Sequence, residues 1–183
     1  MTEKPEAKQS ASGNTPNLLN RIFQKRDRQR EQLKNARMVI RGADLPLERN
    51  QMGWFRWYLH PDIEDVGHRA LVCYVQEIPP GGRSGLQLHQ GGRAHLIWQG
   101  KGYTLIDGVR HYWEAGDVLL LTIKPEGTTH QHFNLDPDHP AKLFVLEPNL
   151  YDTLGVDIGS GFEQLGDAPE DPEGYPNSPS SSQ

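Results

Sequence analysis

Five histidines lie close together in the middle of the sequence, at positions 89, 95, 111, 130 and 132. Imidazole binds iron, zinc, copper and nickel, so several histidines that converge in one pocket indicate a metal site. Taken alone, each histidine is better explained as a hydrogen-bonded core or surface residue. The sequence therefore predicts metal chemistry only if the fold brings several of these side chains together.

The elements that must position these histidines are short strands separated by turns. Residues that favour strands predict them over 70–78, 84–90, 93–99, 102–106, 109–114, 117–123, 129–134 and 142–148. The intervening segments are rich in Gly, Pro and Asp, and Asp107-Gly108 is typical of a two-residue hairpin. Regularly spaced short strands favour an all-β sandwich or barrel.

The alternation of side chains along a strand predicts which polar residues share a face. Residues two apart point to the same side of a sheet. Three such pairs occur: Gln87 with His89, Arg93 with His95, and His130 with His132. If the three strands line one barrel, several imidazoles converge inside it.

The rest of the chain differs in composition from this strand region. The expected divisions are a disordered polar tail (1–16), a helix (17–41), a loop with an edge strand (42–69), the barrel (70–150) and an acidic, Pro/Ser-rich disordered tail (151–183). Asn17 is the expected N-cap of the helix. The aromatic segment GWFRWYL is expected to extend a sheet edge or to cross to a partner subunit.

The predicted helix is strongly basic. Between Arg21 and Arg41 there are eight basic and two acidic residues, which favours a solvated helix held by its apolar ends. A helix that binds an anionic partner or a membrane surface is the alternative, but the charges interrupt its apolar stripe.

Length, charge and cysteine content exclude several classes of protein. The chain has 183 residues and a formal net charge of −5, which suits one domain and disfavours nucleic acid as the main partner. Cys73 is the single cysteine, so no intrachain disulfide can form. The sequence contains no apolar run of transmembrane length and no secretory signal at its N-terminus. These features predict a cytoplasmic protein with a small-molecule partner and no membrane partner.

The strand region contains two motifs that resemble those of the cupin family. The first cupin motif consists of a glycine, two histidines separated by one residue, a glutamate and a second glycine, all at fixed spacing. That spacing is met here by Gly81, Gln87, His89, Arg93 and Gly100. Glutamine thus replaces the first histidine and arginine replaces the glutamate, so only His89 carries over as a ligand from this motif.

The second cupin motif is closer to the family pattern. Its proline, second glycine, histidine and asparagine are met by Pro125, Gly127, His130 and Asn134, although the interval after Gly116 is longer than in the family. The resemblance covers about residues 70–148. It implies a single antiparallel jelly-roll β-barrel, here preceded by an N-terminal α-helix, and a homodimer.

Within the cupins, the sequence resembles the gentisate-type ring-cleaving dioxygenases. The resemblance lies in GKGYTLIDGVRHYWEAGD followed by HQHFN. Those enzymes hold one Fe(II) with three histidines and lack the glutamate of the first motif. By position, His89 and His130 are the expected ligands, and either Gln87 or His95 completes the set. The choice among Fe(II), Mn, Ni and Zn stays open.

The resemblance also implies roles for residues around the metal. His132 is expected to act as an acid/base or oxygen-stabilising group. Arg93 is expected either to anchor a substrate carboxylate or to turn outward to solvent, and His111 is expected to be structural or exposed. The leading hypothesis is a mononuclear non-haem Fe(II) dioxygenase that acts on a hydroxylated aromatic or enolic small molecule. A non-catalytic, small-molecule-binding or sensory cupin and a metal-dependent lyase or isomerase are the alternatives.

Overall fold

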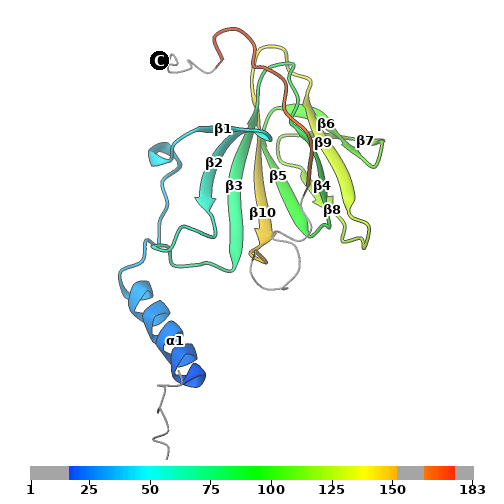
Figure 1. Cartoon of the computed structure of the whole chain (residues 1–183). Coiled ribbons are helices and arrows are strands. Elements are labelled where there is room, and N and C mark those ends of the chain that lie inside the picture. Colours follow the sequence, from blue (N-terminus) through cyan, green and yellow to red (C-terminus); the bar gives the residue numbers. More distant parts are fainter. Residues whose placement is uncertain (1–16, 152–162, 176–183) are drawn as a thin grey trace, which may run out of the picture. The chain divides into compact units, whose positions relative to one another are not determined.

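The computed structural model describes residues 17–151 and 163–175, which form one α-helix, one 3-10 helix and eleven strands (Figure 1). The helices are α1 (Leu18–Lys34) and η1 (Gly42–Asp44). The strands are β1 (Glu48–Asn50), β2 (Gly53–Leu59), β3 (Leu71–Ile78), β4 (Leu86–His89), β5 (Arg93–Gln99), β6 (Lys101–Ile106), β7 (Val109–Glu114), β8 (Val118–Leu121), β9 (Thr128–Asn134), β10 (Ala141–Pro148) and β11 (Glu163–Gly166).

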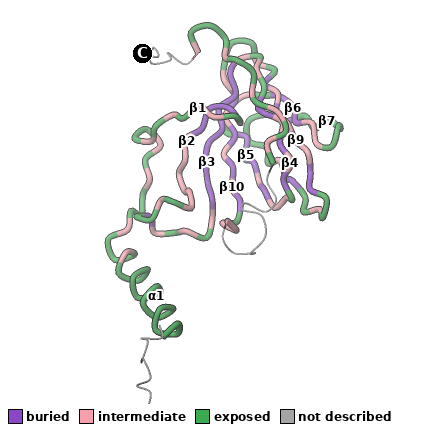
Figure 2. The backbone as a smooth tube through the Cα atoms, in the orientation of Figure 1, coloured by how far each residue is buried: buried purple, intermediate pink, exposed green. Residues whose placement is uncertain are grey.

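The strands form two antiparallel sheets that enclose the core. The order in the six-stranded sheet is β1-β2-β3-β10-β5-β8, and in the five-stranded sheet it is β11-β4-β9-β6-β7. Alternate residues of β5, β9 and β10 are buried. Figure 2 shows buried residues gathered along the central strands. The apolar part of the core includes Phe55, Tyr74, Ile97, Leu143 and Val145. These antiparallel sheets confirm the predicted β-barrel. Turn residues end its strands close to the positions that the sequence predicts.

The aromatic strand β2 lies inside a sheet rather than at its edge. It pairs with β3 on one side and with the three-residue strand β1 on the other. Phe55 is fully buried, and its ring lies 4.6 Å from that of Tyr74 and 5.3 Å from that of Trp57. The segment GWFRWYL therefore extends the six-stranded sheet beyond β3, but short β1, which also lies within 42–69, is the outermost strand. The rings of Phe55 and Tyr74 pack within the chain's own core.

Helix α1 is shorter than the predicted 17–41. Asn17 is its N-cap, as expected, and its side-chain oxygen accepts a hydrogen bond from the Asn20 N–H at 3.1 Å. The helix ends at Lys34 because Asn35 leaves helical geometry, with φ −115° and ψ 18°. No residue of α1 is buried. No helix among the described residues is long and apolar enough to cross a membrane.

Part of the C-terminal tail is ordered, although its composition predicts disorder. Strand β11 pairs with β4. Beyond it, Asp171 accepts hydrogen bonds from Arg49 at 3.2 Å and from the Trp54 indole at 2.9 Å. Backbone pairing and these buried partners order the segment despite its polar composition. The remaining expectations for residues 1–16, 152–162 and 176–183 lie outside the described residues.

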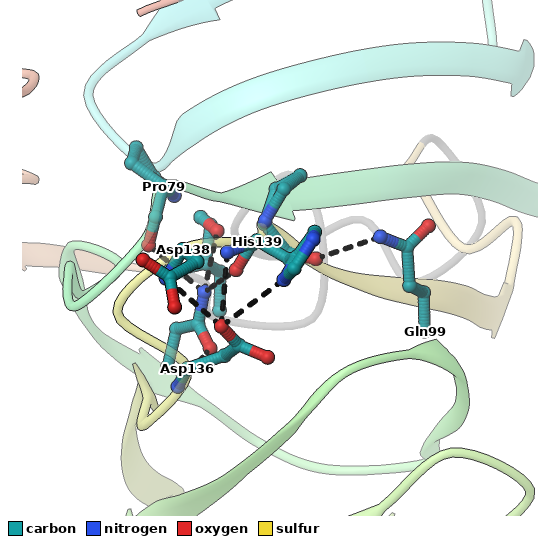
Figure 3. A network of polar contacts seen from close by, with 8 residues as sticks. Pro79, Gln99, Asp136, Asp138 and His139 are labelled. Carbon is teal, nitrogen blue, oxygen red and sulfur yellow. Dashed lines mark hydrogen bonds and ion pairs between the residues drawn. The ribbon is translucent and has the colours of Figure 1, made fainter.

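Asn134 fastens the loop between β9 and β10 to the barrel. Its amide nitrogen lies 3.2 Å, 3.0 Å and 2.8 Å from the carbonyl oxygens of Ile78, Pro79 and His139, respectively. Next to it, the Asp136 carboxylate accepts hydrogen bonds from the backbone N–H groups of Asp138 and His139 (Figure 3). The asparagine of the second motif therefore has a structural role, which is to satisfy carbonyl groups that a loop leaves unpaired.

Replacing Asn134 with alanine is expected to destabilise the fold by about 1–3 kcal/mol, because buried carbonyl groups lose their donor. The measurement is urea denaturation of the wild type and the variant. Asn149→Ala is the matched control, because the Asn149 amide donates to a single carbonyl, that of Arg69. A loss for Asn134→Ala no larger than that of the control would contradict the assigned role.

Candidate metal centre

Three histidines from the two sheets meet inside the barrel. His95 lies on β5 of the six-stranded sheet, while His130 and His132 lie on β9 of the five-stranded sheet. One ring nitrogen of each lies within 4.8 Å of a ring nitrogen of each of the others. The ring centroids are 4.9–6.1 Å apart. The alternation of β5 and β9 points these three side chains, the His triad, into the same interior space.

The His triad has the chemistry that a bound metal requires. The three residues are only 1–2% exposed, and Nδ1 of His95, Nδ1 of His130 and Nε2 of His132 are buried without a hydrogen-bond partner. Buried polar atoms normally have partners, so three unpartnered ring nitrogens in one group require an explanation. Imidazole nitrogens suit Fe, Zn, Cu and Ni, and the residues therefore fit a mononuclear metal ion.

Burial keeps these imidazoles in the neutral form that binds metals. It lowers the pKa of His95 and His130 well below the ordinary value, with further lowering from the neighbouring imidazoles and Arg93. Burial, helped by Arg93, also lowers the pKa of His132 to about 3. At neutral pH each ring therefore has one nitrogen lone pair, and a metal ion need not displace a proton.

The remaining ring nitrogen of His132 is held by a buried hydrogen-bond chain. Its Nδ1 lies 2.7 Å from the Thr104 hydroxyl on β6, and the Trp113 indole N–H on β7 donates to that hydroxyl at 2.9 Å. Thr104 is fully buried, and Trp113 is 5% exposed. This chain leaves Nε2 of His132 facing the interior.

The two altered positions of the first motif belong to a second buried polar group. Arg93 donates through Nε to the Glu147 carboxylate at 2.6 Å and through Nη1 to the Gln87 amide oxygen at 3.1 Å. His89 Nε2 lies 3.1 Å from the same Glu147 oxygen. All four side chains are at most 6% exposed. This mouth network of Gln87, His89, Arg93 and Glu147 therefore balances the Arg93 charge with a carboxylate of the chain itself.

Both ring nitrogens of His89 are engaged in hydrogen bonds. The backbone N–H of Gly91 donates to Nδ1 at 3.0 Å, so in the neutral ring the proton lies on Nε2 and points toward Glu147. A metal ligand needs a free lone pair on one of these nitrogens. The hydrogen bonds therefore hold His89 away from metal binding in this arrangement, and the Gln87 oxygen is likewise occupied by Arg93.

Glu147 is ionised at neutral pH despite its burial. Burial alone raises the pKa of its carboxyl, but the hydrogen bond from His89 and the charge and hydrogen bond of Arg93 outweigh it and leave the pKa below the ordinary value. Glu147 and His89 also line a small cavity of about 60 Å³ beside Tyr151, to which the His triad does not contribute.

The structure thus divides the predicted site residues between two groups. Of the four expected ligands, His95 and His130 lie in the His triad, whereas Gln87 and His89 lie in the mouth network. His132, expected to be an acid/base group, is the third member of the triad. Arg93 points inward, and His111 is exposed on β7.

The sequence analysis missed Glu147 and Thr104. Glu147 is the one charged residue at the inward positions of β10, where it follows buried Leu143 and Val145. Thr104 occupies an inward position of β6, opposite His132 in the register. Glu147 could have been found in the sequence as an ionisable residue at an inward position of an otherwise apolar strand. Thr104 could be found only once the pairing of β6 with β9 was known.

Comparison with known proteins finds a likeness to cupins within the barrel. Residues 74–147 match the family model described as a cupin domain. Among curated protein sequences, none matches the chain. The matched residues run from β3 to β10 and include both the His triad and the mouth network.

Solved structures show the same fold at low sequence identity. The polyketide cyclase RemF from Streptomyces resistomycificus is 16% identical, with a TM-score of 0.50, and the match covers 61% of this chain and 79% of that one. An oxalate decarboxylase is 15% identical, with a TM-score of 0.51, over 68% of this chain and 31% of that one. A cupin-like protein from Thermotoga maritima is 21% identical, with a TM-score of 0.48, over 68% and 90% of the two chains. The cupin jelly roll expected from the sequence is confirmed.

Proposed function

We propose that this cupin-fold chain is a mononuclear metal-dependent dioxygenase, with Fe(II) held by His95, His130 and His132, that acts on a hydroxylated aromatic or enolic small molecule. The observation that carries the proposal is the group of three buried, neutral imidazoles with unpartnered nitrogens. A site of three histidines without a carboxylate also agrees with the resemblance to gentisate-type dioxygenases. Bound Fe(II) would supply open coordination positions for substrate oxygens and for O2.

The residues of the chain supply binding, orientation and a closed environment. The triad would hold the ion from both sheets, and the burial of the three rings limits the access of water to them. In this proposal His132 provides a ligand nitrogen, whereas the sequence led us to expect an acid/base group at this position. Glu147 neutralises Arg93, which would otherwise repel a cation near His95. The mouth network therefore serves the metal site electrostatically.

The proposal is tested by anaerobic loading with Fe(II), followed by oxygen-electrode measurements with a panel of hydroxylated aromatic and enolic compounds. The wild type should hold about one iron per chain and consume O2 with at least one compound. His130→Ala should lose both, and His111→Ala, which alters an exposed histidine, should lose neither. Iron-loaded wild type that consumes no more O2 than His130→Ala would refute the dioxygenase function.

A second candidate is a metal-containing cupin that binds a small molecule without turnover. The two altered positions of the first motif favour it, because Gln87 and Arg93 hydrogen-bond to each other at 3.1 Å. Tight binding of a panel compound by the iron-loaded protein, without O2 consumption or product, would favour this candidate. Product formation without O2 would instead indicate a lyase or isomerase.

A further inference from the structure

We propose that Thr104, supported by Trp113, is the positioning residue that sets the tautomer of His132 so that its Nε2 can bind the metal; this inference rests on the proposed metal centre. The starting observation is the buried chain in which the Trp113 indole, the Thr104 hydroxyl and His132 Nδ1 follow one another at 2.9 Å and 2.7 Å. The chain comes from three adjacent strands, since β6 pairs with both β7 and β9.

Hydrogen-bond counting limits the states of this chain. An indole N–H can only donate, so Trp113 always uses one lone pair of the Thr104 oxygen. The hydroxyl then has two options toward His132 Nδ1: it donates its own proton, or it accepts a proton from Nδ1 with its second lone pair. Rotation of the hydroxyl together with transfer of the ring proton between Nε2 and Nδ1 converts one option into the other without movement of any heavy atom.

The two options give His132 opposite properties at Nε2. When Thr104 donates to Nδ1, the proton of the neutral ring lies on Nε2, which then cannot bind a metal. When Thr104 accepts from Nδ1–H, the buried Nε2, which has no hydrogen-bond partner, has a lone pair that can bind a metal. Metal binding therefore requires that the hydroxyl act as an acceptor, and Trp113 fixes the oxygen where it can do so.

The other two members of the triad have backbone partners instead, Leu119 for His95 and Thr128 for His130. Among the described residues, Thr104 is the side chain that hydrogen-bonds a triad imidazole, and it is fully buried. Water therefore cannot easily replace it. Partners of metal-bound histidines fix ring orientation and tautomer, and their loss typically lowers metal affinity about 10–100-fold.

The test compares zinc affinity and the His132 tautomer in wild type, Thr104→Val and Thr104→Ser. Zn²⁺ is the probe, because it permits both a competition titration against a chelator and NMR of the ring nitrogens. Valine keeps the shape of threonine but removes the hydroxyl, so we expect about 10–100-fold weaker zinc binding. In the zinc-loaded wild type, His132 should carry its proton on Nδ1. In metal-free Thr104→Val the proton should lie on Nε2, while serine should restore wild-type behaviour.

One control variant and the wild type itself separate this inference from folding effects and from the metal centre. Thr129→Val removes a threonine hydroxyl on β9 that donates to the Asp107 carboxylate at 3.0 Å. Thr129 alternates with buried His130 along the strand and therefore lies on its other face. Thr129→Val should keep wild-type zinc affinity. Equal zinc affinity in wild type and Thr104→Val, or a proton on Nε2 in the zinc-loaded wild type, would overturn the inference while leaving the metal centre standing. Failure of the wild type to bind zinc would overturn the metal centre as well.

Discussion

Replacing Glu147 with alanine is expected to destabilise the protein by about 3–5 kcal/mol, the usual cost of removing one partner of a buried ion pair. The variant leaves Arg93 charged and 4% exposed, and it also removes the partner of His89 Nε2. Arg93 keeps its hydrogen bond to Gln87 but loses the opposite charge that offsets its desolvation. Chemical denaturation of the metal-free protein measures the loss directly.

Glu77→Ala is a matched control for this prediction. Glu77 is as buried as Glu147, at 6%, but it pairs with Arg56, which is about one third exposed, at 3.2 Å. Arg56 keeps access to water when its partner is removed, so the loss should be clearly smaller than that of Glu147→Ala. Equal losses in the two variants would contradict the view that the mouth network is a strongly coupled buried unit.

Replacing His132 with alanine is expected to weaken metal binding at least 100-fold. Two imidazoles remain in the variant, so the ion loses one of its three ligands from the chain. His89→Ala is the informative counterpart, because both nitrogens of His89 are engaged by Gly91 and Glu147. We expect His89→Ala to keep about one metal per chain, measured by elemental analysis after loading and desalting.

The opposite pattern would refute the assignment of the ligands. If His89→Ala lost its metal while His132→Ala kept it, the metal would lie at the first-motif position and the hydrogen bonds of His89 would have to break on binding. The two substituted residues lie on different strands, β4 and β9. Circular dichroism of each variant shows whether the strands are retained, and it thereby distinguishes loss of a ligand from unfolding.

The sequence was sufficient for the strands of the barrel and for most inward positions. Turn residues mark the strand ends, and alternation correctly pairs His130 with His132 and Arg93 with His95 on inward faces. Alternation does not predict how far along the barrel axis a side chain lies, nor which residues of the two sheets face each other. His95 and His132 each lie two residues beyond a motif position, which is about 7 Å along a strand.

Two further departures have similar causes. The ion pair of Arg93 with Glu147 joins residues 54 positions apart, so local pattern could not reveal that the arginine has an internal partner. Strand β11 was missed because Leu165 is the one apolar residue among its four, and the segment becomes a strand through pairing with β4 rather than through its own propensity. Non-local pairing therefore decides both the mouth network and the C-terminal strand.

The most direct test of the displaced metal centre is the anomalous scattering of a crystal loaded with iron, measured at the iron edge. The account predicts one peak per chain, coordinated by nitrogens of His95, His130 and His132 and outside coordination distance of Gln87 and His89. A peak bound by His89 and the Gln87 oxygen, with Arg93 released from Gln87, would contradict it.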